Sequence, residues 1–135
     1  KMGQGMDERY FFGDDPEAFR LYETLRNRVL TEVGDAQIRV QSSQITLSNR
    51  HVFACVSRLR VRKKSEMPPA YIVVTFGLAH ALDSPRIAAK SQPYPNRWTY
   101  HVAIGKPEEI DGELMEWIKE AYLFSLEKQT GDVRR

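Results

Sequence analysis

Two segments of the chain repeat apolar residues at the spacing of an amphipathic helix, and the first lies near the N-terminus. In GDDPEAFRLYETLRNRVLTEVGD, residues 13–35, the apolar positions are Ala18, Leu21, Tyr22, Leu25, Val29 and Val33. Asp14 or Asp15 can cap the first backbone N–H groups, and Pro16 suits the first helical turn. Gly34 favours an end to the helix. The pattern predicts a helix of about five turns.

The second helical pattern lies near the C-terminus, in GKPEEIDGELMEWIKEAYLFSLEK, residues 105–128. Asp111 is placed to be its N-cap, and Pro107 falls in a preceding turn. The apolar stripe consists of Ile110, Leu114, Trp117, Ile118, Ala121 and Phe124. One apolar face on each helix indicates that both helices pack against a common surface.

Between the helices, apolar residues alternate with polar ones or run continuously, as in β-strands. The predicted strands are Ile38–Val40, Ile45–Leu47, Val52 to about Arg62, Ala70–Leu78, Arg86–Lys90 and Trp98–Ile104. Residues 91–97, SQPYPNR, are predicted to be a loop because they contain two prolines. Strands that follow one another without helices between them imply an antiparallel sheet. We therefore expect an α+β fold with about five or six strands and both helices on one face.

Composition narrows the class of protein only slightly. Of 135 residues, 41% are hydrophobic and 28% charged, and the net charge is +2, as in an ordinary globular domain. We expect one domain over residues 10–128 with flexible ends at 1–9 and 129–135. No apolar run approaches the roughly 18 residues of a membrane-spanning helix, so we expect no membrane association. The single cysteine favours a cytoplasmic location.

Basic residues gather in the segment SRLRVRKK, residues 57–64. Arg58, Arg60 and Arg62 alternate with Leu59 and Val61, so on a strand the three guanidinium groups would share one face. Three aligned arginines can hold phosphate or carboxylate groups. The alternative is a solvated face on which these arginines pair with acids of a neighbouring strand.

A second candidate surface combines polar and aromatic residues near strand ends, namely Ser43, Gln44, Arg86, Tyr94 and Arg97. Tyr94 lies between two prolines that hold it extended, and Arg97 follows at a loop tip, where binding residues are common. His101 is expected on a sheet face, opposite the apolar residues of its strand. A turn conformation without a binding role is the alternative for this loop.

No sequence motif identifies an enzyme or a metal site. If the segment is a continuous strand, the backbones of His51 and Cys55 are about 13 Å apart, too far for a nucleophile and its base. His51, His80 and His101 have no partner at a metal-binding spacing, and no glycine-rich phosphate loop is present. We expect neither a metal ion nor a cofactor, and Cys55 is interpreted as a structural residue.

Several motifs together resemble a known family. They are YFFGDDPEAFRLYETLRNRVL, SSQITLSNRHVFACVS, YIVVTFGL, SPRI, PNRWTYHVAI and EEIDGELMEWIKEAY. In this order, from Tyr10 to about Lys128, they resemble the bacterial family called domain of unknown function 5655. The resemblance implies a small α+β domain without an assigned substrate. The family's second strand commonly opens with Lys-Ser/Thr-Gln; Ser43 and Gln44 match, whereas Ser42 stands where lysine is common.

Three classes of function follow as hypotheses. The first is a non-catalytic domain that binds an anionic ligand or nucleic acid on an open sheet face. The second is a protein–protein interaction domain or homodimer that uses the same face. The third is an enzyme with an unrecognised active site around Gln44, Arg58 and His101.

Overall fold

A computed structural model describes the backbone of residues 2–133 and the side chains of residues 7–127. The ends predicted to be flexible, 1–9 and 129–135, lie in large part outside the described side chains. The helices are α1 (Met2–Phe11), α2 (Pro16–Arg28) with a π-helical continuation η1 (Val29–Val33), and α3 (Gly112–Val133). The strands are β1 (Gln37–Val40), β2 (Ile45–Ser48), β3 (Val52–Ser57), β4 (Ile72–Leu78), β5 (Ile87–Tyr94) and β6 (Arg97–Ile104). Two short 3-10 turns, η2 (Lys64–Glu66) and η3 (Pro107–Glu109), lie in connecting segments.

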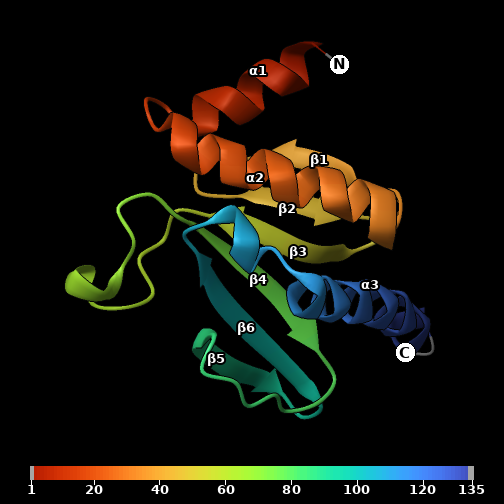
Figure 1. Cartoon of the computed structure of the whole chain (residues 1–135). Helices are drawn as coiled ribbons and strands as arrows, with labels where there is room; N and C mark the ends of the chain where they lie inside the picture. The colour runs from red at the N-terminus through yellow and green to blue at the C-terminus, as the bar shows by residue number, and fades with distance from the viewer. Residues whose placement is uncertain (1, 134–135) are drawn as a thin grey trace.

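The six strands form one antiparallel sheet in the order β1-β2-β3-β4-β6-β5. Helices α2 and α3 lie on the same face of this sheet (Figure 1). The predicted α+β class, strand number and placement of the two helices are therefore confirmed. Helix α1 was not among the predicted elements, and it lies beside α2 near β1.

The core fills the space between the two helices and the sheet. Asp15 caps α2, because its Oδ1 accepts a hydrogen bond from the backbone N–H of Ala18 at 3.1 Å. Asp111 does the same for α3 through the N–H of Leu114, also at 3.1 Å. The buried residues that meet across the core include Leu21, Tyr22 and Leu25 of α2, Leu114 and Ile118 of α3, and Leu47, Val56, Val74, Phe76, Tyr100 and Val102 of the sheet. Both predicted apolar stripes thus face the core.

A buried ion pair attaches α1 to α2. Glu8 is only 3% exposed, and its carboxylate accepts hydrogen bonds from the Tyr22 hydroxyl and, at 2.7 Å, from Arg26 Nη1. Burial and the neighbouring Glu8 carboxylate raise the pKa of Tyr22 far above its ordinary value. A carboxylate removed from water is tolerated only when it is paired in this way.

The predicted long strand to Arg62 is wrong, because β3 ends at Ser57. Residues 58–71 form a loop that projects away from the sheet (Figure 1). Arg58 turns toward the start of α2, where its Nη2 lies 3.0 Å from Asp15 Oδ2, and Arg62 donates to the carbonyl of Pro85 at 3.1 Å. Alternation alone cannot extend a strand whose neighbours provide no further partners. The three arginines therefore do not share a sheet face.

The hairpin of β5 and β6 also differs from the prediction. Strand β5 continues to Tyr94, through residues predicted to be a loop. Proline is tolerated here because β5 is the edge strand of the sheet. The connection is tight: Tyr94 pairs with Arg97, and Asn96 adopts a positive φ of 60° after Pro95.

Strands β3 and β4 separate at one end of the sheet. Their pairing runs from Ser57↔Val73 to Ala54↔Phe76 and stops there. Strand β4 nevertheless continues beside β6 through Gly77↔Thr99 and Leu78↔Trp98. The first residues of β3 instead follow β2, with an irregular register between Leu47 and Ser48. The sheet is therefore split between β3 and β4 beneath α3, and this split positions the candidate site.

Candidate functional site

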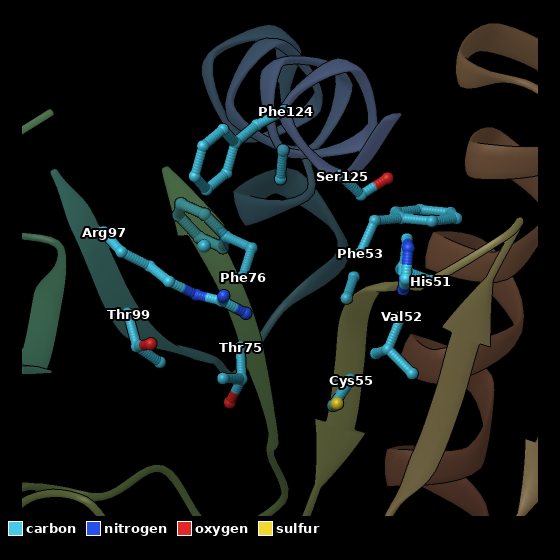
Figure 2. A pocket seen from close by; sticks show the side chains of 13 residues that line it. His51, Val52, Phe53, Cys55, Thr75, Phe76, Arg97, Thr99, Phe124 and Ser125 are labelled. Carbon is cyan, nitrogen blue, oxygen red and sulfur yellow. The ribbon is translucent and has the colours of Figure 1, made fainter. Parts of the chain in front are cut away.

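A cavity of about 410 Å³ occupies the split between β3 and β4 (Figure 2). Its size is within the range of small-molecule sites. The lining residues come from β3 and the turn before it, from β4, from β6 and from α3: His51, Val52, Phe53, Ala54, Cys55, Thr75, Phe76, Gly77, Arg97, Thr99, Ala121, Phe124 and Ser125. Four segments distant in sequence thus contribute to one concave surface.

The wall nearest α3 is apolar and held by ring contacts. Phe76 stacks on Trp117 with ring centroids 5.9 Å apart, and Phe53 meets Tyr122 edge to face at 5.1 Å. Phe124 projects from α3 into the same region (Figure 2). Because Phe53 and Phe76 belong to the hydrophobic core, this wall is fixed by the packing that holds the fold together.

The wall toward the uncovered face of the sheet is polar. Cys55, Thr75 and Thr99 occupy positions that alternate with core residues, so they point away from the helices. Gly77 pairs with Thr99 and contributes no side chain. A Cβ atom placed on Gly77 would meet only the backbone oxygen of Trp98, at 3.5 Å. The missing side chain of Gly77 thus keeps the floor of the cavity open.

Arg97 brings the only positively charged lysine or arginine side chain among the described residues that line the cavity. It extends from β6 toward the gap between the strands (Figure 2). Its guanidinium lies 5.7 Å from the ring centroid of Tyr94, and no described acidic residue forms an ion pair with it. The described lining contains no aspartate or glutamate either. The charge of Arg97 is therefore not neutralised within the described part of the chain.

Cys55, which lines the cavity, and His101, which lies behind the lining residue Thr75, have shifted pKa values. Thr75 Oγ1 lies 2.8 Å from Nδ1 of His101, its cross-strand neighbour on the same face. Burial lowers the pKa of His101, so the neutral imidazole is favoured at pH 7. The tautomer of this neutral ring sets which of the two groups, the Thr75 hydroxyl or His101 Nδ1, donates the hydrogen bond. Burial likewise raises the pKa of the Cys55 thiol, which therefore remains protonated and weakly reactive at neutral pH.

His51 lies across the cavity from Arg97, beside the start of β3 (Figure 2). Its Nε2 atom is buried and has no hydrogen-bond partner among the described residues. An unpaired buried nitrogen costs free energy, about 1–3 kcal/mol when its lost hydration is not replaced. His51 therefore adds an unsatisfied polar atom to the cavity lining, on the side opposite Arg97.

Of the arginines predicted to bind a ligand, Arg97 is the one that lines the cavity. The ring of Tyr94 contacts the guanidinium of Arg97. Arg86 is not with them: its Nη1 lies 2.9 Å from Asp111 Oδ1 and 3.1 Å from Glu113 Oε1 at the start of α3. The structure does not bring Arg86 together with this loop, because Arg86 precedes β5 whereas Tyr94 ends that strand, and the guanidinium of Arg86 binds carboxylates of α3.

Ser43 and Gln44 lie in the turn between β1 and β2, which is closed by the N–H of Gln41 and the carbonyl of Gln44 at 2.8 Å. The register of the strands places this turn at the end of the sheet opposite Arg97. The surface predicted to combine these two residues with Tyr94 and Arg97 is therefore not formed.

The residues named for an enzyme are not brought together either. Arg58 binds Asp15 on the helix-covered side, whereas His101 lies on the uncovered face behind Thr75. Gln44 is in the distant turn, where its side chain approaches Gln41 at 3.4 Å. His101 therefore keeps only an indirect place, as the partner of a cavity hydroxyl.

Sequence reasoning missed most of the cavity. A glycine inside an apolar strand often marks a close approach or an opening, so Gly77 was the one residue with a usable signal. Thr75, Phe124 and Ser125 carry no such mark, because their role depends on the separation of β3 from β4.

Among the residues whose side chains are described, no three His, Cys, Asp or Glu residues are grouped to hold a metal ion. No helix in the described range has both the length and the apolar character needed to cross a membrane.

The fold and the cavity define a small α+β domain with an antiparallel sheet, one uncovered face and a gap between two central strands. Residues 8–125 match the family described as a domain of unknown function, DUF5655, and the chain belongs to this family. Neither the curated proteins nor the solved structures include a match to the chain.

Proposed function

We propose that this domain binds a small anionic molecule in the cavity between β3 and β4. The observation that carries the proposal is the charge of the lining: Arg97 has no acidic partner among the described residues, and none of the described lining residues is an acid. Thr99 adds a hydroxyl group on the same strand as Arg97. A guanidinium with hydroxyl groups beside it suits a carboxylate or a phosphate.

Binding of matched anionic and neutral probes tests this function. We expect benzoate and phenyl phosphate to bind at least about tenfold more tightly than benzamide, because only the anions form charge-assisted hydrogen bonds with Arg97. The substitution Arg97→Gln should remove the preference, measured by isothermal titration calorimetry. Arg60→Gln is the control, since Arg60 is exposed and outside the cavity. Equal affinity for benzoate and benzamide, or no effect of Arg97→Gln, would contradict the proposal.

Nucleic-acid binding is a second candidate, favoured by the loop between β3 and β4. Arg60, Lys63 and Lys64 are exposed there, and no described acid forms an ion pair with them. If these three residues contact phosphates of duplex DNA, the logarithm of the binding constant should fall with the logarithm of the salt concentration, with a slope of roughly −0.9 per contact. A gel shift with short DNA and RNA at two salt concentrations tests it, and the triple substitution to glutamine should abolish any shift.

The homodimer alternative remains a prediction. Strands β1 and β5 are the two edges of the sheet, where a second copy can add a strand. Sedimentation velocity at two protein concentrations tests it, and a wholly monomeric result would count against it.

A further inference from the structure

The cavity has two chemically different ends, and they belong to opposite faces of the sheet. At the end beneath α3 the walls are mainly the rings of Phe53, Phe76 and Phe124, and the hydroxyl of Ser125 there donates to the Tyr122 carbonyl. At the other end lie Arg97 and Thr99, on the side that the helices leave uncovered. The two ends connect because β3 no longer pairs with β4 beyond Ala54↔Phe76. A ligand that fills the cavity therefore passes through the plane of the sheet.

We infer that the ligand is an amphipathic carboxylate, with an apolar chain or ring beneath α3 and a single carboxylate at Arg97. This inference rests on the proposed function and specifies the ligand of that site. The carboxylate can take two parallel hydrogen bonds from the planar guanidinium, and the apolar body is removed from water by the aromatic wall.

The number of cations favours one negative charge over several. Arg97 is the only arginine or lysine among the described lining residues. A diphosphate or triphosphate would bring two or more charges to one guanidinium, and a ligand that filled the cavity would carry the remaining charge toward the phenylalanine rings. Burial of an unpaired charge against an apolar wall is strongly unfavourable. A monocarboxylate matches both the charge and the division of the cavity into a polar and an apolar end.

A series of straight-chain carboxylates tests the inference with wild-type protein. Dissociation constants for acetate, butanoate, hexanoate and octanoate are measured by ligand-observed NMR, with hexanamide as the uncharged match of hexanoate. We expect affinity to rise about fourfold for each added methylene until the apolar end is filled, since each buried CH₂ adds a similar amount to the free energy of binding. Hexanamide should bind at least about tenfold more weakly than hexanoate.

The variants Phe124→Ala and Leu123→Ala locate the apolar body. Phe124 lines the cavity, whereas its neighbour Leu123 is 52% exposed and outside it. Phe124→Ala should weaken hexanoate about tenfold or more and leave acetate within about twofold, because the ring contacts only the chain. Leu123→Ala should change neither, and circular dichroism verifies that both variants are folded.

The outcomes separate this inference from the function on which it rests. If acetate and hexanoate bind equally through Arg97, the anion site stands and the amphipathic ligand is overturned. If hexanamide binds as tightly as hexanoate, the anion site itself is wrong. If none of the carboxylates binds, both proposals fail. Equal effects of Phe124→Ala on acetate and hexanoate in the folded variant would also overturn the inference, because they would show that the Phe124 ring does not contact the chain of the ligand.

Discussion

Arg86, in the turn before β5, and Arg97, at the start of β6, flank the same edge hairpin, yet their surroundings differ completely. Arg86 is held by the carboxylates of Asp111 and Glu113, at 2.9 and 3.1 Å, and by the carbonyl of Glu109 at 2.5 Å. Its guanidinium also lies 5.7 Å from the ring centroid of Trp117. Arg97 has the ring of Tyr94 at the same distance and no acidic partner among the described residues.

Because their interaction partners differ, we infer different roles for the two arginines. Every hydrogen-bonding direction of a guanidinium that is used within the fold is lost to a ligand. Arg86 connects the segment before β5 to the start of α3, which makes it a structural residue. Arg97 lies at a cavity with most of its donors unused by described residues. An arginine without an internal partner in a concave site is the better candidate for binding.

The largest effect should come from removing Arg86. We expect Arg86→Ala to lower the free energy of unfolding by about 2 kcal/mol, because charge-assisted hydrogen bonds disappear and Asp111 is left beside Glu113. Arg97→Ala should cost only about 0.5 kcal/mol, the value of an exposed cation–π contact. Urea denaturation monitored by circular dichroism measures both. Equal losses would show that the two arginines do not differ in this way.

Next in size is the effect of filling the cavity floor. Gly77→Val adds a side chain at a position where only the Trp98 backbone oxygen is near. We expect benzoate affinity to fall by about tenfold or more through steric exclusion, with Arg97 still present. Stability should be unchanged or slightly higher, because valine favours a strand. Ala103→Val is the matched control on the same uncovered face, outside the cavity, and it should leave the affinity unchanged.

The single cysteine offers a smaller but more local measurement. Cys55 lines the cavity together with Arg97, so the rates of its alkylation by iodoacetate and by iodoacetamide report the local charge. Burial raises the pKa of Cys55, and the reaction is therefore measured at pH 9, where more thiolate is present to displace iodide. We expect the ratio of the two rates to fall about threefold in Arg97→Gln and to stay constant in Arg60→Gln. A constant ratio in both variants would show that the charge of Arg97 does not act on the cavity around Cys55.

The smallest expected effects extend the comparison to two histidines. The Ala81 carbonyl and the Glu120 carboxylate raise the pKa of His80 above 6.5, so its contribution to stability is complete below pH 6.5 and disappears as pH rises through the folded-state pKa. Burial lowers the pKa of His101, so its contribution is complete above pH 6.5 and disappears as pH falls through the folded-state pKa. Urea denaturation of His80→Asn and His101→Asn between pH 5 and 8 should show opposite trends relative to wild type. Parallel trends would contradict this account.

The spacing of apolar residues predicted most of the secondary structure, because a helix or strand that is buried on one face has apolar residues at regular intervals along the chain. Tyr100, Val102 and Ile104 alternate with polar neighbours, and all three are buried. The same alternation misled at Arg58 and Arg62, because a strand also needs a pairing partner and none extends past Ser57. Strand pairing is a tertiary property that one segment cannot reveal.

The candidate site was predictable only in part for the same reason. Arg97 follows from its position at a tight turn, whereas the cavity beside it exists because β3 leaves β4 after Ala54. The difference between Arg86 and Arg97 was equally hidden, since Asp111 is 25 residues from the arginine that it binds.

The separation of β3 from β4 also divides the chain into two contiguous parts. Residues 37–57 contain the pairings of β1, β2 and β3, and residues 72–104 contain those of β4, β5 and β6. Four of the five strand pairings are thus local, and only the one between β3 and β4 crosses the projecting loop of residues 58–71. A break in that loop would leave two fragments joined by a single short strand pairing and by the packing of α2 and α3 on the common core. The architecture is therefore suited to fragment complementation, with the ligand-binding gap reassembled at the junction.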